Sequence, residues 1–155
     1  MRKHTIRKQT VQKFMTISPV VISSDATLCQ ARRLMRERNI RHLPVVDGGQ
    51  LVGIVSQRDL YLLETLKGVD PAAEVVREAM TGDPYAVPPD APLDEVATAM
   101  ADRKYGSAVV VDRGSVIGVF TTVDALRALA GLVRRRQASA RGARDEAASA
   151  VRQGT

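Results

Sequence analysis

The chain has 155 residues and a mass of 16.8 kDa, with 45% hydrophobic and 26% charged residues, so a disordered or fibrous protein is excluded. No apolar run approaches the ~20 residues of a membrane span, and a single Cys excludes an intrachain disulfide and favours a reducing, cytoplasmic compartment. The net charge is +6, and the low aromatic content of 3%, with no Trp, argues against stacking platforms for single-stranded nucleic acid.

The positive charge is concentrated at the two ends of the chain. Residues 1–13 carry +5 and residues 133–155 carry +4, so the stretch between them is mildly acidic at −3. We assign a basic N-terminal arm to residues 1–10. Basic ends can bind nucleic acid or an acidic surface, and they can equally be solvated tails that keep the protein soluble.

The segment after the arm predicts five short elements in the order β-α-β-β-α. The helix carries Leu28, Ala31, Leu34 and Met35 on one face, which is the spacing of an amphipathic helix. In chain order we expect a β run at 20–22, a helix that starts at a capping box from Thr27 to Gln30, strands at 43–46 and 51–55 joined by a Gly-rich turn, and a helix ending at Leu66.

The same pattern returns 65 residues later without a gap. Chance can match one dipeptide but does not hold one register over an entire unit, so the chain contains two copies of one supersecondary unit. The matching positions include Met15-Thr16 with Met80-Thr81, Asp25-Ala26 with Asp90-Ala91, Val45-Val46-Asp47 with Val110-Val111-Asp112, Gly53 with Gly118, and Asp59 with Asp124.

These matches define two repeats joined by a linker at 67–74. We assign the first repeat to residues 11–68 and the second to residues 69–132, where Pro92 suits a first helical turn. The remainder, 133–155, is a basic tail rich in Ala and Arg. This tail could prolong a helix from Val123, although Gly131 and Gly142 each weaken such a helix by about 1 kcal/mol.

Each repeat contains a Gly-x-x-Ser/Thr-x-x-Asp pattern where a strand ends and a helix begins. The hydroxyl of Ser56 or Thr121 can bond a phosphate or ribose oxygen at a helix N-terminus. The carboxylate of Asp59 or Asp124 can accept hydrogen bonds from both ribose hydroxyls. The same residue pairs can also be helix caps, which the fold alone could require.

The order of the elements and their residues resembles the cystathionine-β-synthase (CBS) domain pair over about residues 11–132. The resemblance is carried by Met15-Thr16, the stretches 39–47 and 53–59, Met80-Thr81, and the stretches 108–112 and 118–124. It implies an α/β (α+β) fold in which two β-α-β-β-α repeats pack about a pseudo-twofold axis with two clefts between them. It also implies a homodimer and a regulatory role, without an enzyme's activity, in binding AMP, ADP, ATP or S-adenosylmethionine.

By this resemblance each cleft takes its ribose-binding Asp from one repeat and its adenine-binding wall from the other. The first cleft would be formed by Thr121 and Asp124 with Thr16, Val21, His42, Leu43 and Pro44. The second would be formed by Ser56, Arg58 and Asp59 with Thr81, Ala86, Ser107 and Ala108.

The two clefts are expected to bind nucleotide with unequal affinity. Arg58 offers a forked cation to phosphate, whereas Val123 stands at its repeat position. The Asp124 cleft would instead gain Arg41 and His42, where the Asp59 cleft has Gly106 and Ser107. A metal site is not expected, and Cys29, near the apolar face of the first helix, is expected to pack in the core.

The sequence therefore favours a regulatory, energy-sensing module that binds an adenosine nucleotide and signals to an effector protein, without a required cofactor or a membrane. The main alternative is a nucleic-acid-associated protein that binds through its basic tails, with the CBS pair as modulator. A small enzyme acting on a nucleotide would need a nucleophile or a metal set, and a purely structural dimerisation module would bind no adenosine compound.

Overall fold

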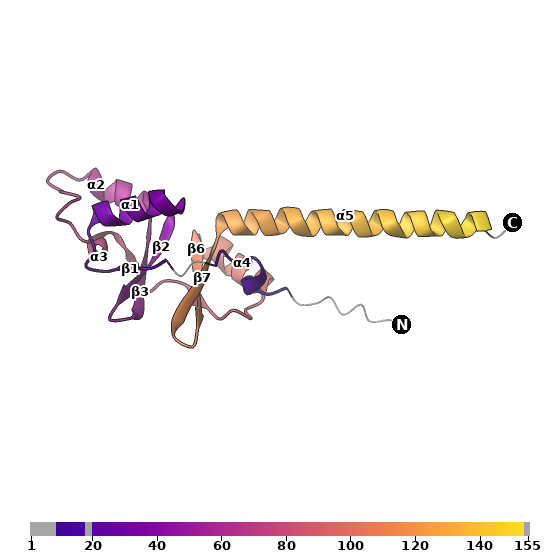
Figure 1. Ribbon diagram of the computed structural model, residues 1–155, viewed down its shortest axis with the longest axis horizontal. Helices are drawn as coiled ribbons and strands as arrows, with labels where there is room; N and C mark the ends of the chain where they lie inside the picture. Colours follow the sequence, from indigo (N-terminus) through magenta and orange to yellow (C-terminus); the bar gives the residue numbers. More distant parts are fainter. Residues whose placement is uncertain (1–8, 18–19, 154–155) are drawn as a thin grey trace.

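The computed structural model describes residues 9–17 and 20–153, and it shows two small α/β units followed by a long projecting helix (Figure 1). In both units the first strand runs parallel to the second, and the second and third strands form an antiparallel hairpin. The predicted fold class and the β-α-β-β-α order of each repeat are confirmed. The first unit contains β1 (Ile22–Ser23), α1 (Leu28–Arg38), β2 (His42–Asp47), β3 (Gln50–Ser56) and α2 (Gln57–Glu64), and the second contains β5 (Ala86–Val87), α4 (Leu93–Arg103), β6 (Ser107–Asp112), β7 (Ser115–Thr121) and α5 (Thr122–Gln153).

Local side-chain chemistry fixes where the helices begin and end. At the start of α1, the Thr27 hydroxyl accepts the N–H of Gln30 at 3.2 Å and the Gln30 side chain accepts the N–H of Thr27 at 2.9 Å, which confirms the predicted capping box. Helices α1 and α4 end at Asn39 and Lys104 in the left-handed conformation. Pro92 is the N-cap of α4 rather than part of its first turn, because its backbone is still extended.

Each repeat contributes its leading segment to the sheet and core of the other. Helix α3 (Val76–Ala79) and strand β4 (Thr81–Gly82) pack on the first unit, where β4 pairs antiparallel with β3. The 3-10 helix Val11–Lys13 and Thr16 pack on the second unit, where Thr16 and Val119 exchange backbone hydrogen bonds of 3.0 Å. The chain is therefore cross-connected, and Thr16 and Thr81 lie where the two units meet.

The predicted boundaries differ from the structure at several element ends. Strand β1 begins two residues later than predicted, because only Ile22 and Ser23 pair with β2. Helix α2 ends at Glu64 rather than Leu66, and α3 and β4 are too short to leave a periodic pattern. Cys29 is exposed on α1 rather than packed in the core.

The C-terminal tail continues the last helix of the second repeat. Helix α5 spans 32 residues and runs through Gly131 and Gly142 without a break. Figure 1 shows it projecting well beyond the two sheets, and residues 133–152 are all exposed. Within the described ranges, no helix has both the length and the apolar composition that crossing a membrane would require.

Candidate functional site

Two separate clefts lie at the starts of α2 and α5, where the repeated Ser/Thr-x-x-Asp patterns are located. The Asp59 cleft has a volume of about 770 Å³ and is lined by both units, including β4, the segment after it, and the loop between α4 and β6. The Asp124 cleft has a volume of about 510 Å³ and is lined by α5, Thr16 and the loop between α1 and β2. Both volumes are in the range of small-molecule sites.

Asp59 caps helix α2 with one of its two carboxylate oxygens. Its Oδ2 accepts hydrogen bonds from the backbone N–H of Ser56 at 2.7 Å and from the Ser56 hydroxyl at 2.8 Å. Among the described residues, no hydrogen bond or ion pair is recorded to its Oδ1. Asp59 is half-buried at the cleft wall, so Oδ1 can accept a further donor from the cleft.

Asp124 makes the same cap but uses both oxygens within the protein. Its Oδ2 accepts from the N–H of Thr121 at 2.9 Å and from the Thr121 hydroxyl at 3.0 Å. Its Oδ1 accepts from the hydroxyl of Thr16 at 3.1 Å and lies 3.8 Å from Nη1 of Arg127. Asp124 is only 4% exposed. Both oxygens of the Asp124 carboxylate are therefore already engaged within the protein, and little of the side chain is exposed to a ligand.

All three tyrosines of the chain border the Asp59 cleft. Tyr85 and Tyr105 stack on each other with ring centroids 5.4 Å apart, and Tyr61 lies in the middle of α2. Aromatic rings provide flat, apolar surfaces on which a planar ring system can pack. The three repeat-equivalent positions hold the aliphatic residues Val20, Ile40 and Leu126.

The Asp59 cleft also gathers cationic side chains from both repeats. Arg58 comes from α2, Arg41 from the loop before β2, and Lys104 from the left-handed end of α4. The carboxylates of Asp59 and Asp83 line the same cleft. These cations can therefore hold an anionic group while Asp59 binds hydroxyl groups.

His42 lies between the two clefts and borders both of them. Burial lowers the pKa of His42 from its ordinary value of 6.5; the carboxylates of Asp59 and Asp124 act in the opposite direction, and Arg41 lowers it further. The loop of the second repeat comes close at this point, because a side chain on Gly106 would lie 3.4 Å from Nε2 of His42. His42 is therefore favoured as a neutral donor or acceptor near pH 7.

The structure brings nine of the fourteen predicted site residues to a cleft wall. Arg41 and His42, which we expected to distinguish the Asp124 cleft, border both clefts because their loop lies between them. Ser56, Arg58, Asp59, Thr81 and Ser107 line the Asp59 cleft, and Thr16, His42, Thr121 and Asp124 line the other, whereas Val21, Leu43, Pro44, Ala86 and Ala108 do not line either cavity.

Three of the five residues away from the cavities are core side chains. Leu43 and Ala108 are 0% exposed, and Pro44 is also fully buried. Their side chains hold β2 and β6 in the cores of the two units. Only their backbone groups could serve a ligand.

Sequence reasoning missed the aromatic and cationic residues that distinguish the Asp59 cleft. Tyr61, Tyr85, Asp83 and Lys104 all line it, and none was singled out as a site residue. The signal was present in the repeat: at an offset of 65, each tyrosine stands where the other copy has an aliphatic residue. Among the described residues, no cluster of three metal-ligating side chains is found.

Comparison with known proteins identifies the repeats. A family model described as the CBS domain matches residues 11–63 and 76–131. The chain is 36% identical over 114 residues to inosine-5'-monophosphate dehydrogenase of Korarchaeum cryptofilum, a match that covers 73% of this chain but only 23% of that enzyme.

Solved structures show the same architecture along almost their whole length. The CBS domain pair of protein MJ0100, in complex with 5'-methylthioadenosine and S-adenosyl-L-methionine, has a TM-score of 0.72 and 28% identity, covering 79% of this chain and 97% of that one. CBSX2 in complex with AMP has a TM-score of 0.66 and 29% identity, with coverage of 79% and 97%.

Proposed function

The chain belongs to the CBS domain family, and from that premise we propose that it is a regulatory module that binds an adenosine-containing ligand in its Asp59 cleft. The observation that carries the proposal is the free Oδ1 of Asp59, in a cleft that also holds three tyrosines and three cationic side chains. Two structural neighbours hold such ligands, AMP in one and S-adenosyl-L-methionine in the other.

The chemistry of the cleft matches the three parts of such a ligand. Oδ1 of Asp59 accepts from the ribose hydroxyls, and the tyrosine faces and apolar wall pack against the adenine. Arg41, Arg58 and Lys104 bind a phosphate chain. Because the cations outnumber the carboxylates, we expect phosphorylated ligands to bind more tightly than S-adenosylmethionine, whose sulfonium is positive.

The Asp124 cleft is the weaker site in this proposal. Its carboxylate already bonds Thr16 and Thr121, so binding there forfeits internal hydrogen bonds that the Asp59 cleft does not have to break. A hydrogen bond to a charged group contributes about 1.5–3 kcal/mol, so the loss of one corresponds to roughly tenfold or more in affinity. This cleft also lacks tyrosines.

Titration calorimetry with ATP, ADP, AMP and S-adenosylmethionine tests the assignment. Asp59→Asn keeps an oxygen for the helix cap but loses the negative acceptor, and we expect affinity to fall about tenfold or more. Asp124→Asn is the matched control and should leave the affinity of the Asp59 cleft unchanged. Equal losses in both variants, or no binding by the wild type, would contradict the proposal.

Regulation would follow from different ligand affinities for two arrangements of the repeats or of two protomers. The energy-sensing role, the homodimer, the effector protein and the cytoplasmic location belong to the same proposal. The activity of the dehydrogenase relative is not carried over, because this chain spans less than a quarter of that enzyme. We propose a regulatory rather than a catalytic role.

A second candidate function is association with nucleic acid, which one feature of α5 favours. Arg127, Arg134 and Arg141 recur at seven-residue spacing, so they lie along one face of the helix. The basic residues at 1–8 lie outside the described residues. A strong fall of nucleic-acid affinity with salt, reduced in Arg134→Gln/Arg141→Gln, would support this candidate.

A further inference from the structure

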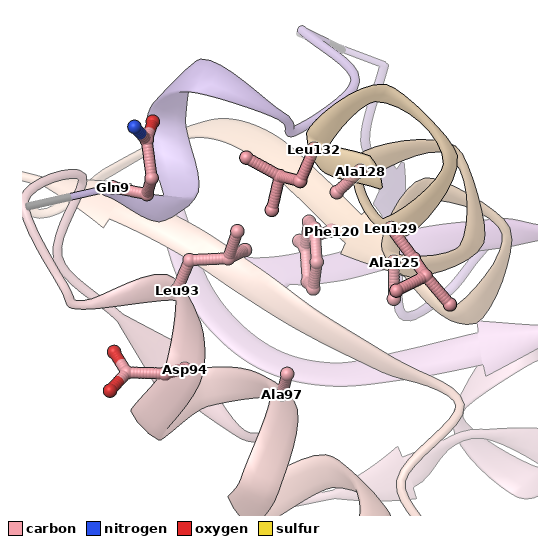
Figure 2. A pocket seen from close by; sticks show the side chains of 9 residues that line it. All are labelled: Gln9, Leu93, Asp94, Ala97, Phe120, Ala125, Ala128, Leu129 and Leu132. Carbon is pink, nitrogen blue, oxygen red and sulfur yellow. The ribbon is translucent and has the colours of Figure 1, made fainter. Parts of the chain in front are cut away.

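Helix α5 borders two cavities of opposite character. The groove between α4 and α5 has a volume of about 580 Å³ and a largely apolar lining (Figure 2). Two of its apolar residues, Ala97 and Leu129, replace an ion pair of the first repeat at the offset of 65. That ion pair joins Arg32 to Glu64. The Asp124 cleft, at the N-terminal end of the same helix, is lined instead by three arginines.

These three arginines reach the Asp124 cleft from both units. Arg38 is the last residue of α1, Arg41 follows in the loop before β2, and Arg127 lies in the second turn of α5. Between the first two, Asn39 adopts the left-handed conformation with a φ of 51°, which ends α1 and turns the chain. Guanidinium groups that are far apart in the sequence therefore line one cavity.

Only one of the three guanidinium groups has a recorded ionic partner. Nη1 of Arg127 lies 3.8 Å from Oδ1 of Asp124, and the Arg127 side chain is 76% exposed. Within the described part of the chain, no ion pair is recorded for Arg38 or Arg41. Three positive charges thus face one carboxylate, so the lining of the cleft has an excess of two positive charges.

This excess is a feature of the Asp124 cleft and not of the fold. At the offset of 65, Arg127 corresponds to Leu62 and Arg41 corresponds to Gly106. In the Asp59 cleft, three cations meet two carboxylates. Helices α2 and α5 begin with the same type of capping pair, so the cap does not require an arginine at position 127.

The same cleft offers little to a nucleoside. Both oxygens of Asp124 are engaged within the protein, so no carboxylate oxygen is free for a ribose. No aromatic side chain lines the cleft, and Ile40 stands at the position that Tyr105 occupies in the Asp59 cleft. The groups that remain available are guanidinium donors, and the positive end of the α5 dipole adds to their charge.

We propose that the Asp124 cleft binds a compact phosphate anion without a nucleoside, such as inorganic phosphate or pyrophosphate. Guanidinium groups form forked, charge-assisted hydrogen bonds with phosphate oxygens. The carboxylate of Asp124 holds Arg127 beside the cleft, and the other nitrogen atoms of that guanidinium stay available to the anion. This inference does not depend on the proposed nucleotide function, because the anion needs neither Asp59 nor the tyrosines.

Titration calorimetry of the full-length chain with inorganic pyrophosphate, at about 0.15 M salt to screen exposed charges, tests the site. We expect pyrophosphate to bind more tightly than orthophosphate, because it has more oxygens for the three guanidinium groups. Arg38→Gln and Arg127→Gln each remove a cation from this cleft alone and should weaken pyrophosphate binding about tenfold or more. Arg135→Gln removes the same charge from the exposed surface of α5 outside both clefts and should leave the affinity unchanged.

Two further measurements identify the ligand and the cleft. Adenosine, which has no phosphate, should not displace pyrophosphate. Arg58→Gln removes a guanidinium from the Asp59 cleft alone, so a loss as large as that of Arg127→Gln would place the anion there and overturn the proposal. Thermal unfolding followed by circular dichroism checks that each variant is folded.

Three other results would also overturn the proposal: no binding of pyrophosphate by the wild type up to about 1 mM, displacement of pyrophosphate by adenosine, or equal losses in Arg127→Gln and Arg135→Gln. A wild type that binds pyrophosphate through Arg127 but binds no adenosine compound would contradict the proposed nucleotide function and support the anion site. The two proposals can therefore fail separately.

Discussion

Replacing Gly53 with alanine tests how the cross-connected segments position the Asp59 cleft. A Cβ at Gly53 would lie 2.5 Å from Sδ of Met80 and 2.9 Å from the backbone oxygen of Thr81. The methionine side chain can rotate away, but the Thr81 backbone is held in the β3–β4 pairing. An ordinary contact begins near 3.4 Å, so β4 must move away by about 0.5 Å.

Overpacking of this kind costs about 1–3 kcal/mol, because moving β4 weakens its two-residue pairing with β3. For a chain of this size, that cost lowers the melting temperature by roughly 3–10 °C. Because Thr81 lines the Asp59 cleft, the affinity for an adenosine ligand should also fall. Thermal unfolding and titration calorimetry measure the two effects.

Two glycine variants serve as matched controls. Gly118→Ala meets Met15 and the Thr16 backbone at 2.6 and 2.9 Å, so it should destabilise by a similar amount but leave the Asp59 cleft intact. Gly82→Ala meets no atom within 4 Å and should change stability by less than about 0.5 kcal/mol. If Gly53→Ala were as stable as Gly82→Ala, the steric argument would be refuted.

Two further predictions concern ionisable side chains. Burial lowers the pKa of His42 below 6.5, so the unfolded chain binds the proton more tightly than the folded protein and stability should fall as the pH drops below about 6.5. Denaturant unfolding at several pH values should show a flatter dependence in His42→Gln, and an unchanged slope would contradict the assignment. Arg32→Ala leaves Glu64, whose side chain is 12% exposed, without its ion-pair partner and should cost about 1–3 kcal/mol. Arg32→Ala/Glu64→Leu, which copies Ala97 and Leu129, should recover most of that loss in the same assay, and a double variant as unstable as Arg32→Ala would count against the comparison of the repeats.

The fold could be predicted because the sequence contains the same β-α-β-β-α unit twice. Turn glycines, the capping residues Thr27 and Ser56, and the apolar face of α1 each have local signals. Gly49, the capping hydroxyl of Ser56 and the apolar face recur at the offset of 65, whereas Pro92 stands in place of Thr27. The cross-connection left no such signal. Strand β4 has two residues and its pairing with β3 is a long-range contact, which hydrophobic periodicity does not report.

The candidate site was predicted in part, for a related reason. Asp59 and Asp124 have the same sequence context, and both proved to be helix caps as well as cleft residues. What separates them is the hydroxyl of Thr16, which reaches Oδ1 of Asp124 from a residue 108 positions away. Sequence spacing cannot report a contact of that kind, so the difference in available oxygens emerged only from the structure.

The two repeats differ most at positions whose side chains do not stabilise the fold. Met15 and Met80, like Gly53 and Gly118, are the same in both copies because each pair fits a strand against a neighbouring backbone. The cleft walls and the groove between α4 and α5 differ between the repeats. The first repeat supplies Arg58 and Tyr61 to a cleft in which Asp59 keeps a free carboxylate oxygen. The second repeat has an open apolar groove between α4 and α5. If ligand binding in the Asp59 cleft is to affect the second repeat, its effect must cross the boundary between the two units. His42 and Gly106 lie in the two loops that meet there, so a ligand that shifts these loops has a direct structural route from one repeat to the other.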